Sequence, residues 1–464
     1  NKELLSLGKM HEISDRPMKT LIRDATIINE GLRYKGSLLI SGERIERIYP
    51  YVLPLNIDLS GFRVIEASGM YLMPGVIDDQ VHFREPGLTH KGDLSSESRA
   101  AVAGGVTSFM DMPNTVPQTT TQEFLEEKYR RAAEVSVANY SFFMGGTNDN
   151  LQEVIKCDPA TVCGIKVFLG SSTGNMLMDD PIALDLLFRE APLLIAAHCE
   201  EESIISANSL AAREQFGDQV PFSWHPVIRN AEACYVSSAR AVERAARYDT
   251  QLHIFHLSTA REMELFNPGP VRDKKITAEV CIHHLWFSDR DYTEKGSQIK
   301  WNPAVKTPED REALWKAILD DRADVVATDH APHTSEEKNT TYFNAPSGGP
   351  LVQHSLVAML EMGRQRKIPP EKIVAKMCHA PAELFRIRER GYLRQGYYAD
   401  LVLVDPKKPW TVSKNNILSK CGWSPFEGIT FGHSVTHTFV NGELVFYDNK
   451  INPDVRGKRL FFDR

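Results

Sequence analysis

The segment GVIDDQVHFREPG, residues 75–87, places polar side chains directly after an apolar run. His82 offers imidazole nitrogens, Arg84 offers a guanidinium group, and two aspartates precede them. A buried strand that ends in this way delivers side chains to a site, and imidazole with carboxylate suits zinc and neighbouring divalent metals. Such strands usually carry two histidines two residues apart, but the first of these positions is Gln80. The segment therefore predicts a metal site that is complete, weakened or lost, depending on what Gln80 does.

Further polar residues stand at the ends of other short apolar runs. They are Asn114, His198, His256, His283 and Asp329. One histidine in such a place is more often a hydrogen-bonded core residue than a ligand, but several that converge on one edge favour a metal centre. A thiolate centre would need clustered cysteines, and the seven cysteines are scattered. We therefore predict a Zn²⁺ centre with one or two ions per subunit.

Lys166 lies in GIKVF, between apolar neighbours. By itself it would be interpreted as a buried amine paired with a carboxylate. Beside a histidine-rich site there is an alternative, because burial lowers the pKa of lysine and a neutral amine can add carbon dioxide. The resulting carbamate can bridge two metals. The sequence leaves both interpretations of Lys166 open.

Asp329 ends the run in VVATDHAPH. It could cap a helix or pair with a basic neighbour. An aspartate on a metal can instead take a proton during attack by water and pass it to a leaving nitrogen. His330 and His333 follow at once and favour this second role, so we predict Asp329 as the catalytic base.

Eight short apolar runs, alternating with helical stretches, must position these residues. The runs cover 76–83, 106–112, 139–145, 164–170, 193–199, 252–258, 276–284 and 324–332. Runs that are apolar throughout are typical of parallel strands buried on both faces. Eight strand–helix units predict an α/β fold with a (β/α)8 TIM barrel, whose active site lies at the carboxyl ends of its strands.

The two ends of the chain have a different pattern, with alternating apolar and polar residues. Near the C-terminus, Asn441-Gly442 between two such runs predicts a hairpin. We predict one small β-domain built from residues 18–72 and 390–464, and a metal-dependent barrel over 73–389. Residues 1–17 are polar without a pattern, and we interpret them as a disordered leader or an expression extension.

Composition limits the possible partners of the chain. It has 464 residues, 42% of them hydrophobic, and a net charge of -7. This balance argues against nucleic acid and membrane surfaces as partners but allows a small anionic substrate. Scattered cysteines, odd in number, indicate free thiols in a reducing compartment, and no apolar stretch suits a signal or a membrane span. We therefore predict a cytoplasmic protein.

Taken together, the motifs resemble those of the amidohydrolase superfamily, and within it the longer class of dihydroorotases. The resemblance is carried by IDDQVHFREPG, DMPNT, GIKVF, AAHCE, HIFHLST, TDHAPH and SPFEG, and extends over nearly all of residues 18–464. It implies an enzyme that interconverts dihydroorotate and N-carbamoyl-L-aspartate in pyrimidine biosynthesis. It also implies a homodimer.

The resemblance assigns roles residue by residue. It implies metal ligands at His82, Lys166 in carboxylated form, His198, His256 and Asp329, with Gln80 in doubt. It implies substrate-binding roles for Arg84, Asn114, Asn302 and His333. Gln80 stands where the family has a second histidine, and an amide oxygen is a weaker ligand. We therefore expect a first metal position that is bound more loosely than the second.

Two alternatives remain at this point. The same barrel serves allantoinases and hydantoinases, so the fold alone does not choose the substrate. Arg84 favours dihydroorotate because this substrate carries a ring carboxylate, which a guanidinium can bind through two charge-assisted hydrogen bonds. The other alternative is a non-catalytic relative that serves as a scaffold, although such relatives typically lose several ligands. The polar, glycine-rich segment 333–350 is either a mobile lid or an ordinary long loop.

Overall fold

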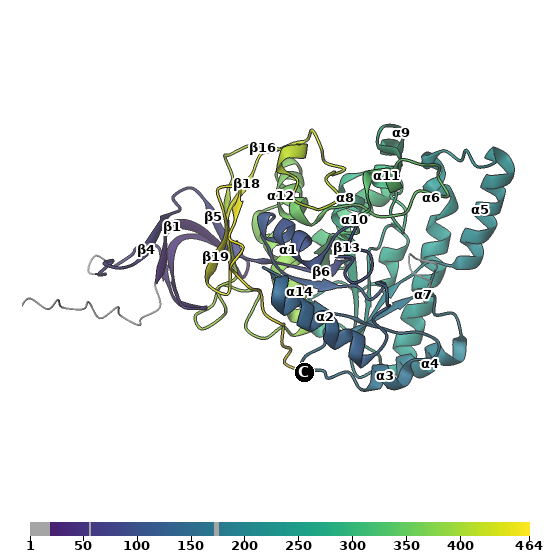
Figure 1. The fold of residues 1–464 in the computed structure, drawn as a ribbon, viewed down its shortest axis with the longest axis horizontal. Helices are drawn as coiled ribbons and strands as arrows, with labels where there is room; N and C mark the ends of the chain where they lie inside the picture. Colours follow the sequence, from purple (N-terminus) through teal and green to yellow (C-terminus); the bar gives the residue numbers. More distant parts are fainter. Residues whose placement is uncertain (1–18, 55–56, 171–175) are drawn as a thin grey trace, which may run out of the picture.

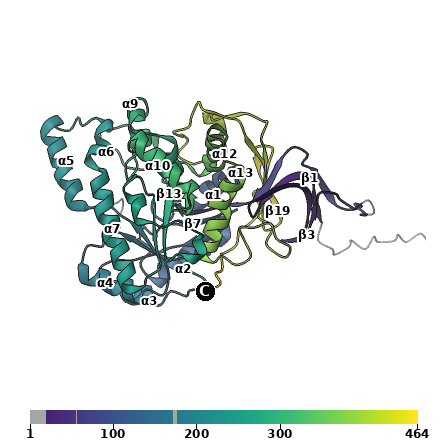
Figure 2. The ribbon, with the colours of Figure 1, turned by 180° about the vertical axis from the view of Figure 1, so that it is seen from behind.

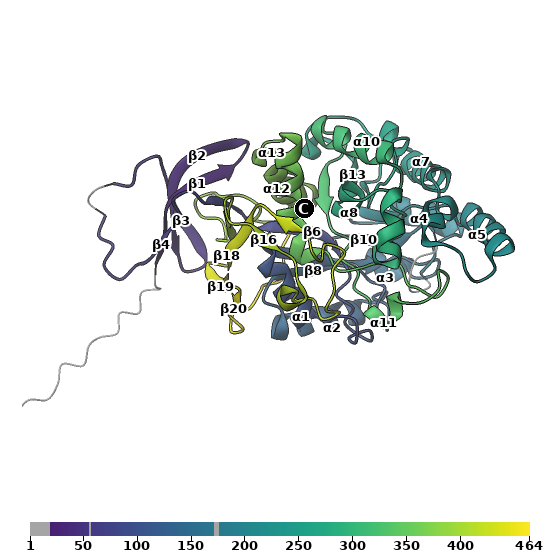
Figure 3. The same ribbon diagram turned by 90° about the horizontal axis from the view of Figure 1, so that it is seen from above.

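The computed structural model describes residues 19–54, 57–170 and 176–464. The predicted leader, residues 1–17, lies outside the described residues. Two groups of strands make up the molecule: parallel strands surrounded by helices, and a mainly antiparallel sheet to one side (Figure 1). Viewed from above, helices such as α4, α7 and α10 lie outside the parallel strands (Figure 3).

Each of the eight predicted parallel strands is present. They are β6 (Val76–Val81), β7 (Val106–Asp111), β8 (Asn139–Phe142) with β9 (Met144–Gly145), β10 (Ile165–Phe168), β11 (Ile195–His198), β12 (Leu252–Ile254), β13 (Ile276–Cys281) and β14 (Val325–Ala327). The run at 139–145 is divided at Phe143, so β8 pairs with β7 while β9 pairs with β10. The strands therefore form two parallel sheets, β6-β7-β8 and β9 to β14, each in chain order.

The first and last strands of this series meet beyond their regular ends. Val81 forms a parallel bridge with His330, and the His82 amide donates to the His330 carbonyl over 2.7 Å. Within β6 the pairing with β7 shifts, because Asp78 stands opposite Phe109 whereas Val81 stands opposite Asp111. The three residues from Asp78 to Val81 in β6 thus match only two in β7. The extra residue forms a β-bulge, which redirects the side chains beside it.

The helices follow the strands, and several of them begin at side-chain caps. They are α1 (Leu94–Ala103), α2 (Gln122–Val135), α3 (Leu151–Ile155), α4 (Pro181–Glu190), α5 (Glu202–Phe216), α6 (His225–Ile228), α7 (Ala231–Tyr248), α8 (Ile282–Trp286), α9 (Tyr292–Lys295), α10 (Pro308–Leu319), α11 (Ser335–Lys338), α12 (Ser355–Arg366), α13 (Pro370–Val374) and α14 (Ala380–Phe385). At α10, for example, Thr307 and Asp310 form a capping box, and Pro308 occupies the first turn. No helix among the described residues is long and apolar enough to cross a membrane.

The antiparallel sheet joins the two ends of the chain. Its strands are β1 (Thr20–Asn29), β2 (Leu32–Ser41), β3 (Arg44–Pro50), β4 (Arg63–Glu66), β5 (Tyr71–Pro74), β15 (Leu401–Asp405), β18 (Ser434–Val440), β19 (Glu443–Tyr447) and β20 (Lys450–Ile451). β15 pairs with β5, so the late strands lie directly beside the early ones, as the views from both sides show (Figures 1 and 2). A separate pair, β16 (Trp410–Thr411) and β17 (Thr430–Phe431), lies near α12.

The predicted hairpin at Asn441-Gly442 connects β18 and β19. Both residues have positive φ, 50° and 81°, as a two-residue hairpin turn of this kind requires. Gly442 also packs against the backbone of Gly42, whose carbonyl oxygen would lie 2.0 Å from an added Cβ. The glycine is therefore required both by the turn and by the contact with the neighbouring loop.

A buried polar cluster fixes the terminal sheet to the parallel strands. Asp400 is bound by Arg390, by the Asn441 amide over 2.8 Å and by the Asn139 side chain over 3.2 Å. Asn139 begins β8, and its side-chain Oδ1 accepts from the Asn441 side-chain amide over 2.8 Å. All four side chains are buried, so each polar group depends on the others for its hydrogen bonds.

We predict that Arg390→Met lowers the free energy of unfolding by about 3–5 kcal/mol, because it leaves the Asp400 carboxylate buried without its cation. Urea denaturation measures this change. The control is Arg388→Met, which removes a half-exposed ion pair with Asp463 and should cost no more than about 1 kcal/mol. Equal losses in the two variants would contradict a structural role for the buried cluster.

Candidate functional site

A small cavity of about 30 Å³ lies where the parallel strands end. Its lining includes nine of the predicted site residues: Gln80, His82, Arg84, Asn114, Lys166, His198, His256, Asn302 and Asp329. They come from the ends of different strands, and elements far apart in the sequence contribute to one site. A larger cavity of about 680 Å³ lies against the terminal sheet, and none of the predicted site residues lines it. The predicted site residues therefore share the smaller cavity.

His82 and Asp329 face each other across the meeting point of the first and last strands. The His82 Nε2 lies 3.1 Å from Asp329 Oδ1. The other ring nitrogen, Nδ1, lies 2.9 Å from Asn114 Oδ1. If Nδ1 carries the proton and donates it to Asn114, the Nε2 lone pair is available to a metal.

His198 and His256 form a second facing pair. The Nδ1 of His198 lies 2.9 Å from Nε2 of His256. The Nε2 of His198 lies 2.9 Å from Glu200 Oε1, and Arg229 binds the same carboxylate. Burial raises the pKa of Glu200, but Arg229 and His198 outweigh it and lower the pKa to about 2. Ionised Glu200 accepts the Nε2 proton and so directs the Nδ1 lone pair of His198 toward the site.

Burial also sets the protonation of the histidines. It lowers the pKa of His82 and His256 well below the usual value and lowers that of His198 as well. All three rings are therefore neutral near pH 7. Metal ligands must be neutral imidazoles, so these rings are in the form that binds a metal.

Lys166 projects from β10 into the same cavity. Its Nζ lies 4.7 Å from the centre of the Phe168 ring and 4.2 Å from that of Phe255. Burial lowers the pKa of the amine to about 8, against the opposing effect of Asp329. A fraction of the amine is therefore neutral near pH 7, which is the form that reacts with carbon dioxide.

The backbone at the strand ends is held in an unusual conformation. Arg84, His256 and Asp329 have φ values of 71°, 39° and 50°, in the left-handed region. Residues other than glycine adopt this region at a cost, and such positions cluster at functional sites. Burial also raises the pKa of Asp329 to about 7. This places a carboxyl group that exchanges protons near neutral pH at the site.

The donor atoms fit a zinc centre. Neutral imidazoles from His82, His198 and His256 line one cavity with the Asp329 carboxylate and the Lys166 amine, while Asn114 and Glu200 bind one ring nitrogen each of His82 and His198. Nitrogen and carboxylate oxygen are typical zinc donors. The side-chain oxygen of Gln80 has a partner other than a metal, since its Oε1 lies 3.6 Å from the Cys281 thiol.

Asn302 and His333 differ in where they lie. Asn302 lines the cavity, and its buried Oδ1 has no hydrogen-bond partner among the described residues. His333 is buried beside the cavity, with Nε2 3.0 Å from Arg84 and 2.9 Å from the Ser347 carbonyl, and Nδ1 2.9 Å from Lys91. If Nδ1 accepts from Lys91, Nε2–H donates to Ser347, and the guanidinium of Arg84 keeps its donors for another group.

His283 is the one predicted strand-end residue that the structure places elsewhere. β13 ends at Cys281, and His283 lies in α8. Its ring stacks on Trp301, with centroids 4.6 Å apart. Trp301 lines the cavity and donates its indole N–H to the Asp329 carbonyl over 3.1 Å. His283 thus supports the wall of the site through Trp301. The strand prediction over 276–284 was too long because the apolar run continues into a helix.

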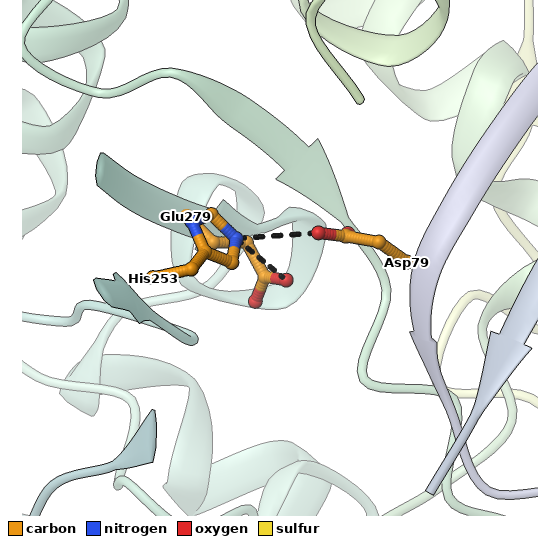
Figure 4. Close-up of side chains that lie close together, drawn as sticks. All are labelled: Asp79, His253 and Glu279. Atoms are coloured by element: carbon orange, nitrogen blue, oxygen red, sulfur yellow. Dashed lines mark ion pairs between the residues drawn. The ribbon is translucent and has the colours of Figure 1, made fainter. Parts of the chain in front are cut away.

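One further group of donors lies apart from the predicted site residues. Asp79, His253 and Glu279 are the one set of three carboxylate, imidazole or thiol donors in the described part of the chain whose atoms all lie within 4.8 Å of one another (Figure 4). All three are fully buried. A signal was available, because each interrupts an apolar strand and a buried ionisable side chain needs a partner.

Most of the chain matches a known protein family. Residues 71–445 match the profile of the Amidohydrolase family. The chain belongs to the amidohydrolase family. This confirms the resemblance that the strand-end motifs carry. In this amidohydrolase the predicted site residues line one cavity at the ends of the parallel strands.

Curated relatives match this amidohydrolase over most of its length. A dihydroorotase of Halobacterium salinarum is 33% identical, covering 92% of this chain and 96% of the relative. A dihydroorotase of Lactobacillus johnsonii is 30% identical, covering 92% and 99%. A dihydroorotase of Carboxydothermus hydrogenoformans is 33% identical, covering 89% and 94%.

Solved structures agree with the fold of this amidohydrolase. The L-hydantoinase of Arthrobacter aurescens superposes with a TM-score of 0.88 at 24% identity, covering 95% of this chain and 99% of that one. The dihydropyrimidinase of Brevibacillus agri has a TM-score of 0.85 at 24% identity, covering 96% and 100%. At this identity the likeness concerns the fold alone.

We predict that Glu200→Gln weakens zinc binding roughly 10- to 100-fold, because the neutral amide no longer fixes the proton of His198. Competition with a chelator measures the affinity. Glu201→Gln is the matched control, since this neighbouring side chain pairs with Arg240 at the surface. An unchanged affinity in Glu200→Gln would separate His198 from the metal.

Proposed function

We propose that this amidohydrolase is a zinc-dependent dihydroorotase, which interconverts dihydroorotate and N-carbamoyl-L-aspartate. The observation that carries the proposal is the guanidinium of Arg84 in the same cavity as His82, Lys166, His198, His256 and Asp329. The curated relatives named dihydroorotase support it. The site thereby combines metal donors, a carboxyl group for proton transfer and a cation for an anionic substrate.

Arg84 is the basis for choosing among cyclic amides. Its Nε donates to the Pro332 carbonyl over 3.0 Å, which fixes the guanidinium plane, and the side chain lines the cavity. Dihydroorotate carries a ring carboxylate, whereas hydantoins and dihydropyrimidines do not. A fixed guanidinium binds such a carboxylate through charge-assisted hydrogen bonds. A neutral ring without a carboxylate would offer the buried guanidinium no anion to bind.

The residues that would hold zinc are His82, Lys166 in its carboxylated form, His198, His256 and Asp329. Bound zinc supplies Lewis acidity at the ring amide and a nucleophile from water at neutral pH. Asp329 accepts a proton during attack on the amide and returns it to the leaving ring nitrogen. Arg84, with Asn114 and His333 beside it, orients the ring through its carboxylate. Asn302 offers its unpartnered Oδ1 to a ring N–H.

The cavity must enlarge for substrate to enter. A volume of about 30 Å³ is close to that of one water molecule, and Ser347 and Gly348 form part of the lining. These two residues belong to segment 333–350, in which α11 lies and Lys338 donates to the carbonyls of Pro346 and Gly348 over 2.9 and 2.7 Å. We infer that this segment acts as a lid in its closed position.

We also propose a domain organisation, an oligomeric state and a cellular compartment for this enzyme. The parallel strands form a closed (β/α)8 barrel over residues 73–389, and residues 18–72 with 390–464 form one β-domain. The bridge between Val81 and His330 and the pairing of β15 with β5 support this division. We propose a homodimer in the cytoplasm, and the seven free cysteines agree with a reducing compartment.

We predict that Arg84→Ala lowers kcat/KM for dihydroorotate on the order of 100-fold, because the substrate carboxylate loses its charge-assisted hydrogen bonds. Steady-state assays in both directions measure the loss, and zinc content should stay at the wild-type level. Any turnover of dihydrouracil, which lacks the carboxylate, should be unaffected by the substitution. Full activity toward dihydroorotate in Arg84→Ala would refute this choice of substrate.

We predict that Asp329→Asn reduces kcat by roughly 10²- to 10⁴-fold, because the amide cannot carry the proton to the leaving nitrogen. Assays at saturating substrate measure kcat, with zinc content determined on the same samples. Asp320→Asn, at a surface pair with Arg322, is the control. Retained turnover in Asp329→Asn would remove this residue from proton transfer.

A further inference from the structure

Three strands contribute one ionisable side chain each to a fully buried group beneath the strand-end cavity. Asp79 comes from β6, His253 from β12 and Glu279 from β13, and each side chain has 0% exposure. Asp79 Oδ2 lies 3.2 Å from His253 Nε2, and Glu279 Oε2 lies 4.0 Å from the same nitrogen. Figure 4 shows both carboxyl groups directed at this nitrogen. None of the three residues lines the strand-end cavity.

We propose that Asp79, His253 and Glu279 bind a divalent first-row metal ion, Zn²⁺ or Mn²⁺, at a site separate from the strand-end centre. One imidazole nitrogen and two carboxylates are a common donor set for such ions. Two carboxylates balance the charge of a divalent cation, and the imidazole adds a neutral donor.

The hydrogen bonds of His253 allow a lone pair on the ring nitrogen that faces the carboxylates. Its Nδ1 lies 2.7 Å from Thr277 Oγ1, and this hydroxyl also lies 3.3 Å from the Leu252 carbonyl. If the hydroxyl donates its single proton to this carbonyl, its oxygen accepts from Nδ1–H, and Nε2 keeps a lone pair. In this form the lone pair and the carboxylates of Asp79 and Glu279 are three acceptors at the point where a cation would bind.

Apart from His253 and each other, the facing carboxylate oxygens have few partners. Both oxygens of Asp79 and the Oε2 of Glu279 are buried without a hydrogen bond among the described residues. An unpaired buried carboxylate is costly, and it is retained when a cation or a bound metal compensates it. The other oxygen of Glu279 is satisfied by the His256 amide over 2.8 Å and by the Cys281 thiol over 3.3 Å. One oxygen of Glu279 is thus fixed by the protein, while the other faces Asp79 and His253.

The bulge in β6 explains why Asp79 reaches this group. Gln80 and His82 line the cavity, so regular alternation would turn Asp79 to the opposite face of the strand. The extra residue between Asp78 and Val81 breaks the alternation. His253 lies three residues before His256, which is about 10 Å along a strand. The proposed site therefore lies deeper than the centre that includes His256.

The first test counts metal ions in the full-length protein. Wild type, Asp79→Asn and Glu279→Gln are stripped with a chelator, given excess Zn²⁺ or Mn²⁺, desalted and analysed by mass spectrometry. Each variant should lose one tightly bound ion relative to wild type, with affinity at this site lowered at least 100-fold. The control is Glu262→Gln, because this buried glutamate is already bound by Ser238 and Thr259 and should retain the full count.

A variant that lacks two strand-end ligands separates this site from the strand-end centre. In His198→Asn/His256→Asn, one ion should remain, and adding Asp79→Asn should remove it. Dihydroorotate turnover does not enter this count, so a failed functional assignment would leave the result unchanged. Identical metal counts in wild type, Asp79→Asn and Glu279→Gln would overturn the proposal.

Crystals of the wild-type protein provide a measurement that requires no variant to fold. Data collected on either side of the zinc or manganese absorption edge should give an anomalous peak between His253 Nε2 and the carboxylates of Asp79 and Glu279. A metal-loaded crystal with peaks at the strand ends but none at this position would also overturn the proposal.

Discussion

Burial of ionisable side chains among parallel strands is the constraint on which this structure depends. Strand interiors exclude water, so every imidazole, amine or carboxyl group there must be neutral, paired or bound to a cation. The same burial that lowers the pKa of His82 and His256 also brings that of Lys166 down to about 8. It raises the pKa of Asp329 to about 7. One physical cause thus yields neutral metal ligands, a reactive amine and a group that exchanges protons near pH 7.

The surrounding elements keep this arrangement fixed. Ionised Glu200, held by Arg229, orients His198, and Trp301 packs between His283 and the Asp329 backbone. The terminal sheet does not enter the cavity. It is attached to β8 through the buried cluster around Asp400, so its contribution to the site is mechanical. Chemistry and support are therefore carried by different layers of the molecule.

The first strand shows how a small local change can redistribute donors. Gln80 replaces a nitrogen donor with a weaker amide oxygen, and its Oε1 approaches the Cys281 thiol. In the same bulge, the carboxylate of the preceding residue, Asp79, reaches His253 on β12. The first strand thus combines Gln80, at a position where we expect a weakened metal ligand, with a neighbouring acid in the strand interior.

The sequence by itself determined the elements and most of the residues that line the strand-end cavity. Apolar runs predicted each parallel strand, because strands buried on both faces leave this pattern regardless of their partners. His82, Lys166, His198, His256 and Asp329 were found because polar residues at strand ends meet at one edge. The Asn441-Gly442 turn was equally local, since positive φ at both positions restricts the residue types.

Only the tertiary structure decided the features that depend on distant partners. The division of the 139–145 run at Phe143 and the end of β13 before His283 follow from pairing with other strands. His333 was assigned to substrate, but the contacts with Lys91 and Ser347 that place it beside Arg84 come from separate segments. The group of Asp79, His253 and Glu279 depends on a bulge, which shifts a side chain by half a strand repeat. No local pattern encodes that shift, because it arises from the register between two strands.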